Sequence, residues 1–128
     1  MRLKNLSLSF GAQIFKALSE EPRVRILHLL FKKNELSISD LEQILDFTQA
    51  KTSRHLTYLK NRGIVNTRHE DQWVFYSIKE EVMDMIRQVM EYLSKDPVLL
   101  NDLENYETLY SNRELASYRK ELRKWQNR

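Results

Sequence analysis

The 128-residue sequence contains no cysteine, and it has only two glycines and two prolines. The lack of cysteine excludes disulfides, thiolate metal sites and thiol redox sensing within these residues, and it favours a cytoplasmic protein. No apolar run approaches the roughly 18 residues of a transmembrane helix, and the opening segment MRLKNLSLSF is too short and polar for a secretory signal. The scarcity of glycine and proline indicates a helix-rich chain.

Charge is arranged in blocks, although the formal net charge is only +3. Residues 48–79 carry six Lys or Arg against two acids, and residues 113–128 carry six against two. Between them, residues 80–112 carry eight acids against two bases. Such an arrangement is typical of a protein with one side facing a polyanion. Ordinary solvated helix faces would explain the charge alone equally well.

Periodic apolar residues predict three helices in the first third of the chain. Helical spacing over residues 8–19 indicates the first. Pro22 then occupies a first helical position and opens the second. Ser39 followed by Glu42 is a capping-box pattern, which predicts the start of a short third helix.

A fourth helix follows closely, and after it the period changes from helical to alternating. Thr48 is suited to cap this helix and Gly63 to end it. Residues 64–68 and 73–78 are rich in β-branched and aromatic side chains and flank the polar tetrad 69–72, which predicts a β-hairpin. The short link between the third and fourth helices is typical of a helix-turn-helix.

Helical spacing then resumes to the end of the chain. Long helices are expected over residues 80–110, with Pro97 opening the second of them, and a basic helix over residues 111–128. Without repeats or linkers, residues 1–128 are expected to form a single domain around a core at 21–79. The fold class is mainly α with a small β-hairpin.

The fourth helix has an apolar side and a polar side. Thr52, Leu56 and Leu59 share one side at spacings of four and three and should pack inward. At about 100° per residue, the opposite side collects short or hydrogen-bonding side chains. These are Gln49, Ala50, Ser53, Arg54 and Thr57. Arg can pair with guanine and Gln with adenine, while Ala or Thr can touch a thymine methyl, so this side is expected to read double-stranded DNA.

Other side chains are expected to lie on DNA phosphates. Lys51, His55 and Tyr58 flank the base-reading side, and Arg68 and His69 lie on the hairpin. A basic hairpin beside a recognition helix can contact phosphates or a neighbouring groove. A polar helix side by itself is as often plain solvated surface as it is a DNA-reading surface. The adjoining hairpin favours the DNA interpretation.

Three stretches resemble the ArsR/SmtB family of bacterial winged-helix repressors. They are ALSEEPRVRIL at 17–27, TSRHLTYLKNRGIV at 52–65 and RHEDQWVFY at 68–76. They match the family's opening segment, its recognition helix and its wing, in the right order and spacing. The resemblance implies a winged helix-turn-helix, a homodimer formed through the first and last helices (8–19 and 80–110), and a repressor that binds a pseudo-palindromic operator and is released by an effector.

The sequence departs from the family's metal sensors. Where arsenite and cadmium sensors have a Cys-x-Cys pair, this chain has Ser37 and Ser39, which supply no thiolate. Zinc and nickel sensors use histidine on a late helix, and residues 80–110 contain none. No metal site or cofactor is therefore expected, and the effector, a small molecule or a protein, stays unidentified.

The wing departs as well. Asp71 stands where the family usually has glycine, and together with Glu70 it places two negative charges at the tip. These charges should repel a close phosphate, which leaves Arg68 and His69 to carry any wing contact.

Two other functions were weighed against DNA reading. A protein-interaction module that keeps the winged-helix scaffold is favoured slightly by the acidic block and the acidic wing tip. An enzyme is disfavoured, because the sequence has no glycine-rich phosphate loop, no cysteine nucleophile and no histidine paired with an acid at recognisable spacing.

Overall fold

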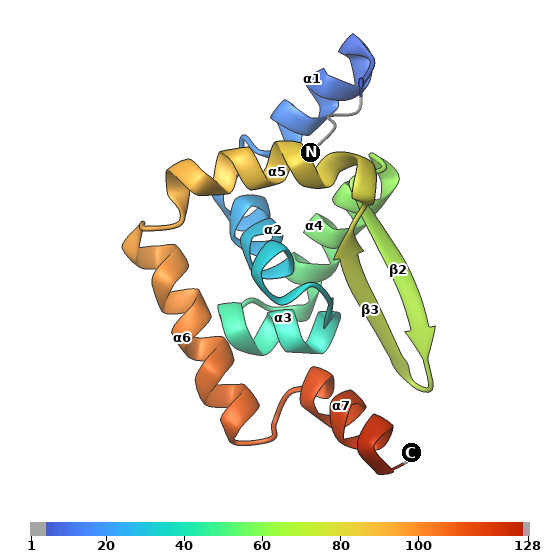
Figure 1. The fold of residues 1–128 in the computed structure, drawn as a ribbon, viewed down its shortest axis with the longest axis vertical. Coiled ribbons are helices and arrows are strands. Elements are labelled where there is room, and N and C mark those ends of the chain that lie inside the picture. The colour runs from blue at the N-terminus through green and yellow to red at the C-terminus, as the bar shows by residue number, and fades with distance from the viewer. Residues whose placement is uncertain (1–4, 127–128) are drawn as a thin grey trace.

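Helices make up most of the computed structural model, which describes residues 5–126 (Figure 1). The elements follow in this order: α1 (Leu8–Ala17), α2 (Glu21–Lys33), β1 (Leu36–Ser37), α3 (Ile38–Leu45), α4 (Gln49–Asn61), β2 (Val65–Glu70), β3 (Trp73–Ile78), α5 (Glu80–Leu93), α6 (Pro97–Ser111) and α7 (Ala116–Gln126). The expected class, mainly α with a small β-hairpin, is confirmed.

The boundaries correct several expectations. The first helix ends at Ala17, before the predicted residue 19. The helical region 80–110 is divided by a break at residues 94–96, after which Pro97 opens α6 as expected. Ser111 still belongs to α6, so the basic helix expected over 111–128 is shorter and begins at Ala116. Residues 127–128 of that prediction lie outside the described residues.

The third helix begins two residues earlier than predicted. Its capping box joins Ser37 and Asp40, not Ser39 and Glu42: the Ser37 hydroxyl accepts from the Asp40 amide and the Asp40 carboxylate accepts from the Ser37 amide, both at 3.0 Å. Ser37 ends strand β1 in a buried position, so its hydroxyl is directed to the helix start. Ser37 and Asp40 have the same spacing as the predicted pair, and the observed box lies directly after strand β1.

The hairpin belongs to a three-stranded antiparallel sheet in the order β1-β3-β2. Strand β1 was not predicted, since two residues are too few to show alternation. The turn is also tighter than the expected tetrad: Glu70 pairs with Trp73, which leaves Asp71 and Gln72 at the tip. Asp71 adopts a φ of +53° there, a conformation that Asp tolerates.

Helix α2 lies at the centre of the molecule, with α5 across one end of it and α6 along its side (Figure 1). Four of its apolar residues, Ile26, Leu27, Leu29 and Leu30, are fully buried in a core shared with α3, α4 and the sheet. Helix α1 projects from this body beside α5, and α7 lies at the opposite end near the wing (Figure 1). Within residues 5–126, no helix combines the length and the apolar character needed to cross a bilayer.

Asp40 fastens α7 to the core. Besides closing the capping box of α3, its buried carboxylate accepts hydrogen bonds from the first amides of α7, Ala116 at 2.6 Å and Ser117 at 3.3 Å. Burial raises the pKa of this carboxyl, while the amide hydrogen bonds act in the opposite direction. Leu115, immediately before the helix, is fully buried in the core. One side chain therefore caps two helices that are far apart in the sequence.

Candidate nucleic-acid interface

The link between α3 and α4 is built from two local conformations. Asp46 ends α3 with a φ of +56°. Thr48 then caps α4, as predicted: its hydroxyl accepts from the Lys51 amide at 3.1 Å. Gly63, with a φ of +77°, follows the end of α4, also as predicted. These caps fix the start and the end of the helix that the sequence assigns to base reading.

The two sides of α4 are separated as the helical spacing predicts. Thr52, Leu56 and Leu59 are buried, and the Thr52 hydroxyl donates to the Thr48 carbonyl at 2.9 Å, so that its polar atom is satisfied inside the protein. All five residues of the expected base-reading side are exposed. They are Gln49, Ala50, Ser53, Arg54 and Thr57. The first turn of a helix with such side chains can approach base edges closely.

His55 is not at the surface and was wrongly expected on phosphates. Its side chain is only 4% exposed. It follows Thr52 by three residues and precedes Leu59 by four, which places it on the buried side of α4. Burial lowers its pKa, and the nearby Arg54 and Arg23 lower it further, so the imidazole is held neutral. The spacing that identified Thr52 as buried would have identified His55 too.

Tyr58 also faces inward at its polar end. Its hydroxyl is buried without a hydrogen-bond partner, so it does not point to a phosphate as expected. Its ring lies between two guanidinium groups, Arg23 at 4.1 Å and Arg62 at 5.0 Å from the ring centroid. Arg23 is itself buried, and its Nε donates to the Ala17 carbonyl at 2.9 Å, which caps the end of α1. Tyr58 thus helps to join α4 to the first two helices.

Arg68 on the wing is engaged within the protein. It grips both carboxylate oxygens of Glu35, at 2.9 and 2.7 Å, and also contacts Glu70 at 3.1 Å. Arg68, with a smaller contribution from Lys120, lowers the pKa of Glu35 to about 2. Arg68 is therefore less available to a phosphate than the sequence suggested, whereas His69 beside it is exposed.

The acidic tip of the wing is matched by α7. Asp71 forms an ion pair with Arg123, whose guanidinium also lies 5.4 Å from the centroid of the Trp73 ring. Lys120, one turn earlier in α7, is 2.5 Å from Glu35. Sequence analysis missed this pairing; the only signal for it was the complementary charge of the tip and of residues 113–128.

The serines at the positions of the family's cysteine pair have structural contacts. The Ser37 hydroxyl caps α3, and the Ser39 hydroxyl lies 3.4 Å from it. Within the part of the chain that the structure describes, no three His, Asp or Glu side chains are grouped to hold a metal ion. His28 is fully buried, and burial lowers its pKa, which suits a neutral core side chain.

Comparison with known proteins identifies similar regulators. The profile of "Bacterial regulatory protein, arsR family" matches residues 20–67. Arsenic resistance transcriptional regulator ArsR1 of Pseudomonas putida is 32% identical over an alignment of 98 residues, which covers 70% of this chain and 77% of that protein. A cadmium resistance transcriptional regulatory protein CadC homolog of Staphylococcus aureus is 39% identical over 80 residues, 62% of this chain and 64% of that protein, so the chain spans slightly less than two thirds of this relative.

A solved structure shares the fold over most of its length. The homodimeric winged helix-turn-helix DNA-binding domain Mb0332 from Mycobacterium bovis superposes with a TM-score of 0.61 and 27% identity, covering 70% of this chain and 87% of that domain. The arrangement of α3, α4 and the hairpin is thus a winged helix-turn-helix.

Proposed function

The chain belongs to the ArsR family of bacterial regulatory proteins, and we propose that it regulates transcription by binding a pseudo-palindromic DNA site as a homodimer. The observation that carries this proposal is the exposed side of α4. Its five residues, from Gln49 to Thr57, lie on the first three turns of a helix whose opposite side is anchored in the core. In this proposal they enter the major groove, with Lys51 on the adjoining phosphates and His69 on the wing side.

A dimer is supported by apolar side chains that the single chain leaves in solvent. Leu8 is 91% exposed, Phe15 64% and Tyr92 88%. The first two lie on α1 and the third near the end of α5, two helices that are neighbours (Figure 1). Covering these groups with a second copy removes apolar surface from water. A two-fold DNA site requires that such a dimer present both α4 helices to the DNA.

Substitutions on α4 test the base-reading assignment. Arg54→Ala should weaken binding to the best site by about 1–3 kcal/mol and flatten the preference at one base position, because a bidentate contact to guanine is lost. Lys51→Ala should weaken all sequences alike, since phosphates are the same everywhere. The measurement is titration of labelled duplexes by fluorescence anisotropy.

Lys95→Ala is the matched control, since Lys95 is exposed in the break between α5 and α6. Equal affinities for wild type and both α4 variants would refute the assignment of α4.

We further propose that this regulator does not sense arsenite or cadmium by thiolate coordination. The chain has no cysteine, and Ser37 and Ser39 already serve the start of α3. The effector would be a small molecule or a protein. As a non-enzymatic regulator of transcription it would act in the cytoplasm, where bacterial DNA is found.

A protein-interaction module is the second candidate, and the engagement of Arg68 by Glu35 is the observation that favours it, because it withdraws a wing cation. The salt dependence of duplex binding distinguishes the DNA-binding regulator from the protein-interaction module. Duplex binding through several basic contacts should weaken steeply as salt rises, whereas a flat response would favour a protein partner.

A further inference from the structure

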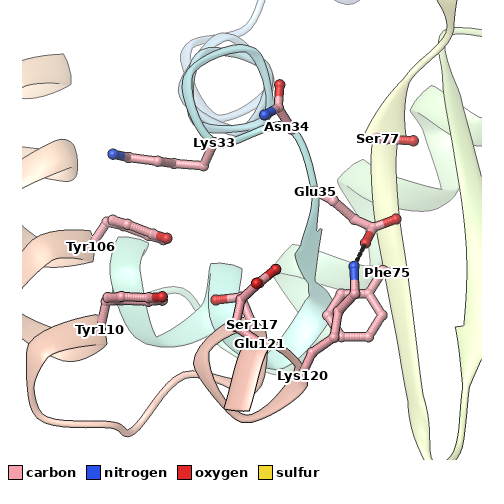
Figure 2. A pocket seen from close by; sticks show the side chains of 10 residues that line it. All are labelled: Lys33, Asn34, Glu35, Phe75, Ser77, Tyr106, Tyr110, Ser117, Lys120 and Glu121. Atoms are coloured by element: carbon pink, nitrogen blue, oxygen red, sulfur yellow. Dashed lines mark hydrogen bonds and ion pairs between the residues drawn. The ribbon is translucent and has the colours of Figure 1, made fainter. Parts of the chain in front are cut away.

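A cavity of about 540 Å³ lies between the end of α2, strand β3, α6 and α7 (Figure 2). Its volume falls within the range of small-molecule sites. Three of its four walls, β3, α6 and α7, lie beyond residues 20–67, which match the family profile. The cavity is therefore not part of the segment that reads DNA, although it borders the wing through β3.

Flat aromatic rings form two sides of the cavity. Tyr106 and Tyr110 project from α6 toward it and stack with their ring centroids 5.5 Å apart, while Phe75 of β3 stands opposite (Figure 2). Burial, with smaller contributions from Tyr110 and Glu107, raises the pKa of Tyr106 to about 12. Its phenol thus stays protonated at neutral pH and can donate a hydrogen bond. Tyr106 and Tyr110 can contact an aromatic ligand, whereas the Phe75 ring is buried beneath Lys120 and Arg68.

Two ammonium groups border the same space, Lys33 from α2 and Lys120 from α7. The partner of Lys33 is Glu107, 2.8 Å away and with its side chain 61% exposed, so water competes for that carboxylate. The partner of Lys120 is Glu35. Both ammonium groups are therefore held by contacts that a bound anion can replace.

Glu35 does not depend on Lys120 for neutralisation. Arg68 already holds both of its oxygens, so the withdrawal of Lys120 leaves no unpaired buried charge. The other carboxylate at the cavity, Glu121, is exposed and screened by solvent. An anion can therefore recruit both lysines at little cost.

An organic cation is a poorer fit to the same walls. The Lys33 ammonium already lies 4.6 Å from the Tyr106 ring centroid, and that of Lys120 lies 5.3 Å from the Phe75 centroid. Arg68 is also 5.0 Å from the Phe75 centroid. A ligand cation would have to displace these groups from the rings and would be repelled by them.

We propose that this cavity binds a small aromatic carboxylate, whose ring lies against the tyrosines and whose carboxylate draws in Lys33 and Lys120, two side chains that point to opposite sides of the cavity (Figure 2). The ligand would be the effector of the proposed regulator, and its effect on DNA binding rests on the proposed function. Arg68 is already the main cation on Glu35, and once Lys120 turns to the ligand it is the one that remains among the described residues. Arg68 is then held more firmly and is less able to turn to a phosphate, so the bound ligand lowers DNA affinity.

Isothermal titration calorimetry of the full chain with sodium 1-naphthoate tests the binding step without DNA. We expect saturable binding with one ligand per chain, and no comparable binding of 1-naphthylmethylammonium, which has a similar shape and the opposite charge. Lys33→Gln and Lys120→Gln should each weaken naphthoate binding by about tenfold, as for the loss of one charge-assisted hydrogen bond. Lys124→Gln, on the exposed side of α7, should bind naphthoate as tightly as the wild type.

Absence of naphthoate binding, equal binding of the cation, or unchanged affinity in both cavity variants would overturn the proposal. Thermal unfolding by circular dichroism verifies that each variant is folded. A second titration measures DNA affinity with and without saturating naphthoate. Failure to bind DNA without ligand would count against the proposed function alone, whereas DNA binding that naphthoate leaves unchanged would overturn the coupling to Arg68.

Discussion

At the scale of single residues, the contact between Glu35 and Arg68 joins the wing to the start of the sheet. Arg68 contacts Glu35 through two nitrogens, and Lys120 approaches the same carboxylate from α7. These partners hold the folded-state pKa of Glu35 at about 2, against an ordinary value of 4.5. Because the folded-state pKa is depressed, the stabilisation is present above pH 4.5 and is lost as pH falls from there toward 2.

Glu35→Gln should therefore destabilise the fold less in acid than at neutral pH. The difference in unfolding free energy between wild type and Glu35→Gln should narrow by about 1 kcal/mol from pH 6 to pH 3.5. Urea denaturation at both values measures it. Glu104→Gln on the exposed side of α6 removes the same charge and should show no such narrowing. A constant difference for Glu35→Gln would contradict the assigned contact.

Some of these residue positions could be read from the sequence and others could not. The exposed side of α4 followed from local spacing, and the same spacing would have shown that His55 is buried. The engagement of Arg68 was beyond reach, because its main partner, Glu35, lies 33 residues before it in the chain. Nothing in a local pattern specifies which distant carboxylate a surface arginine will contact.

At the scale of elements, α7 connects the core to the wing. Its start is held by Asp40 and by the buried Leu115, and further along the helix Lys120 and Arg123 contact acids of the sheet and the wing tip. The acidic tip is thus neutralised within the chain, a point that changes the expectation of a repulsive wing.

Leu115→Ala should destabilise the protein by about 2–5 kcal/mol, because it opens a cavity where α7 joins the core. Leu122→Ala, within α7 but exposed, should cost well under half of that. Equilibrium denaturation in urea gives both values. Equal effects of the two substitutions would show that α7 is not anchored at Leu115.

Elements with strong local signals were predictable, and those set by tertiary pairing were not. The caps at Thr48 and Gly63 and the opening of α6 at Pro97 follow from side-chain and backbone chemistry within a few residues. Strand β1 exists only because β3 pairs with it, and the capping box of α3 lies directly after β1.

At the scale of the whole molecule, the account requires two copies of the chain. Phe15→Asp should shift the protein toward monomer, because it places a charge in the apolar surface that α1 would bury in the dimer. Analytical ultracentrifugation over a range of concentrations measures the change. Leu122→Asp, an exposed leucine at the other end of the molecule, should leave the mass of the assembly unchanged. A Phe15→Asp protein that associates like wild type would exclude α1 from the interface.

The central claim is that exposed side chains of α4 read a two-fold DNA site. Selection of bound sequences from a random duplex pool at moderate salt tests it most directly. The account predicts enrichment of a pseudo-palindrome whose half-sites lie one helical turn apart, roughly 10 base pairs, or a multiple of it. It also predicts that Arg54→Ala loses the preference at one position of each half-site. Failure of the wild-type chain to enrich any motif would contradict it.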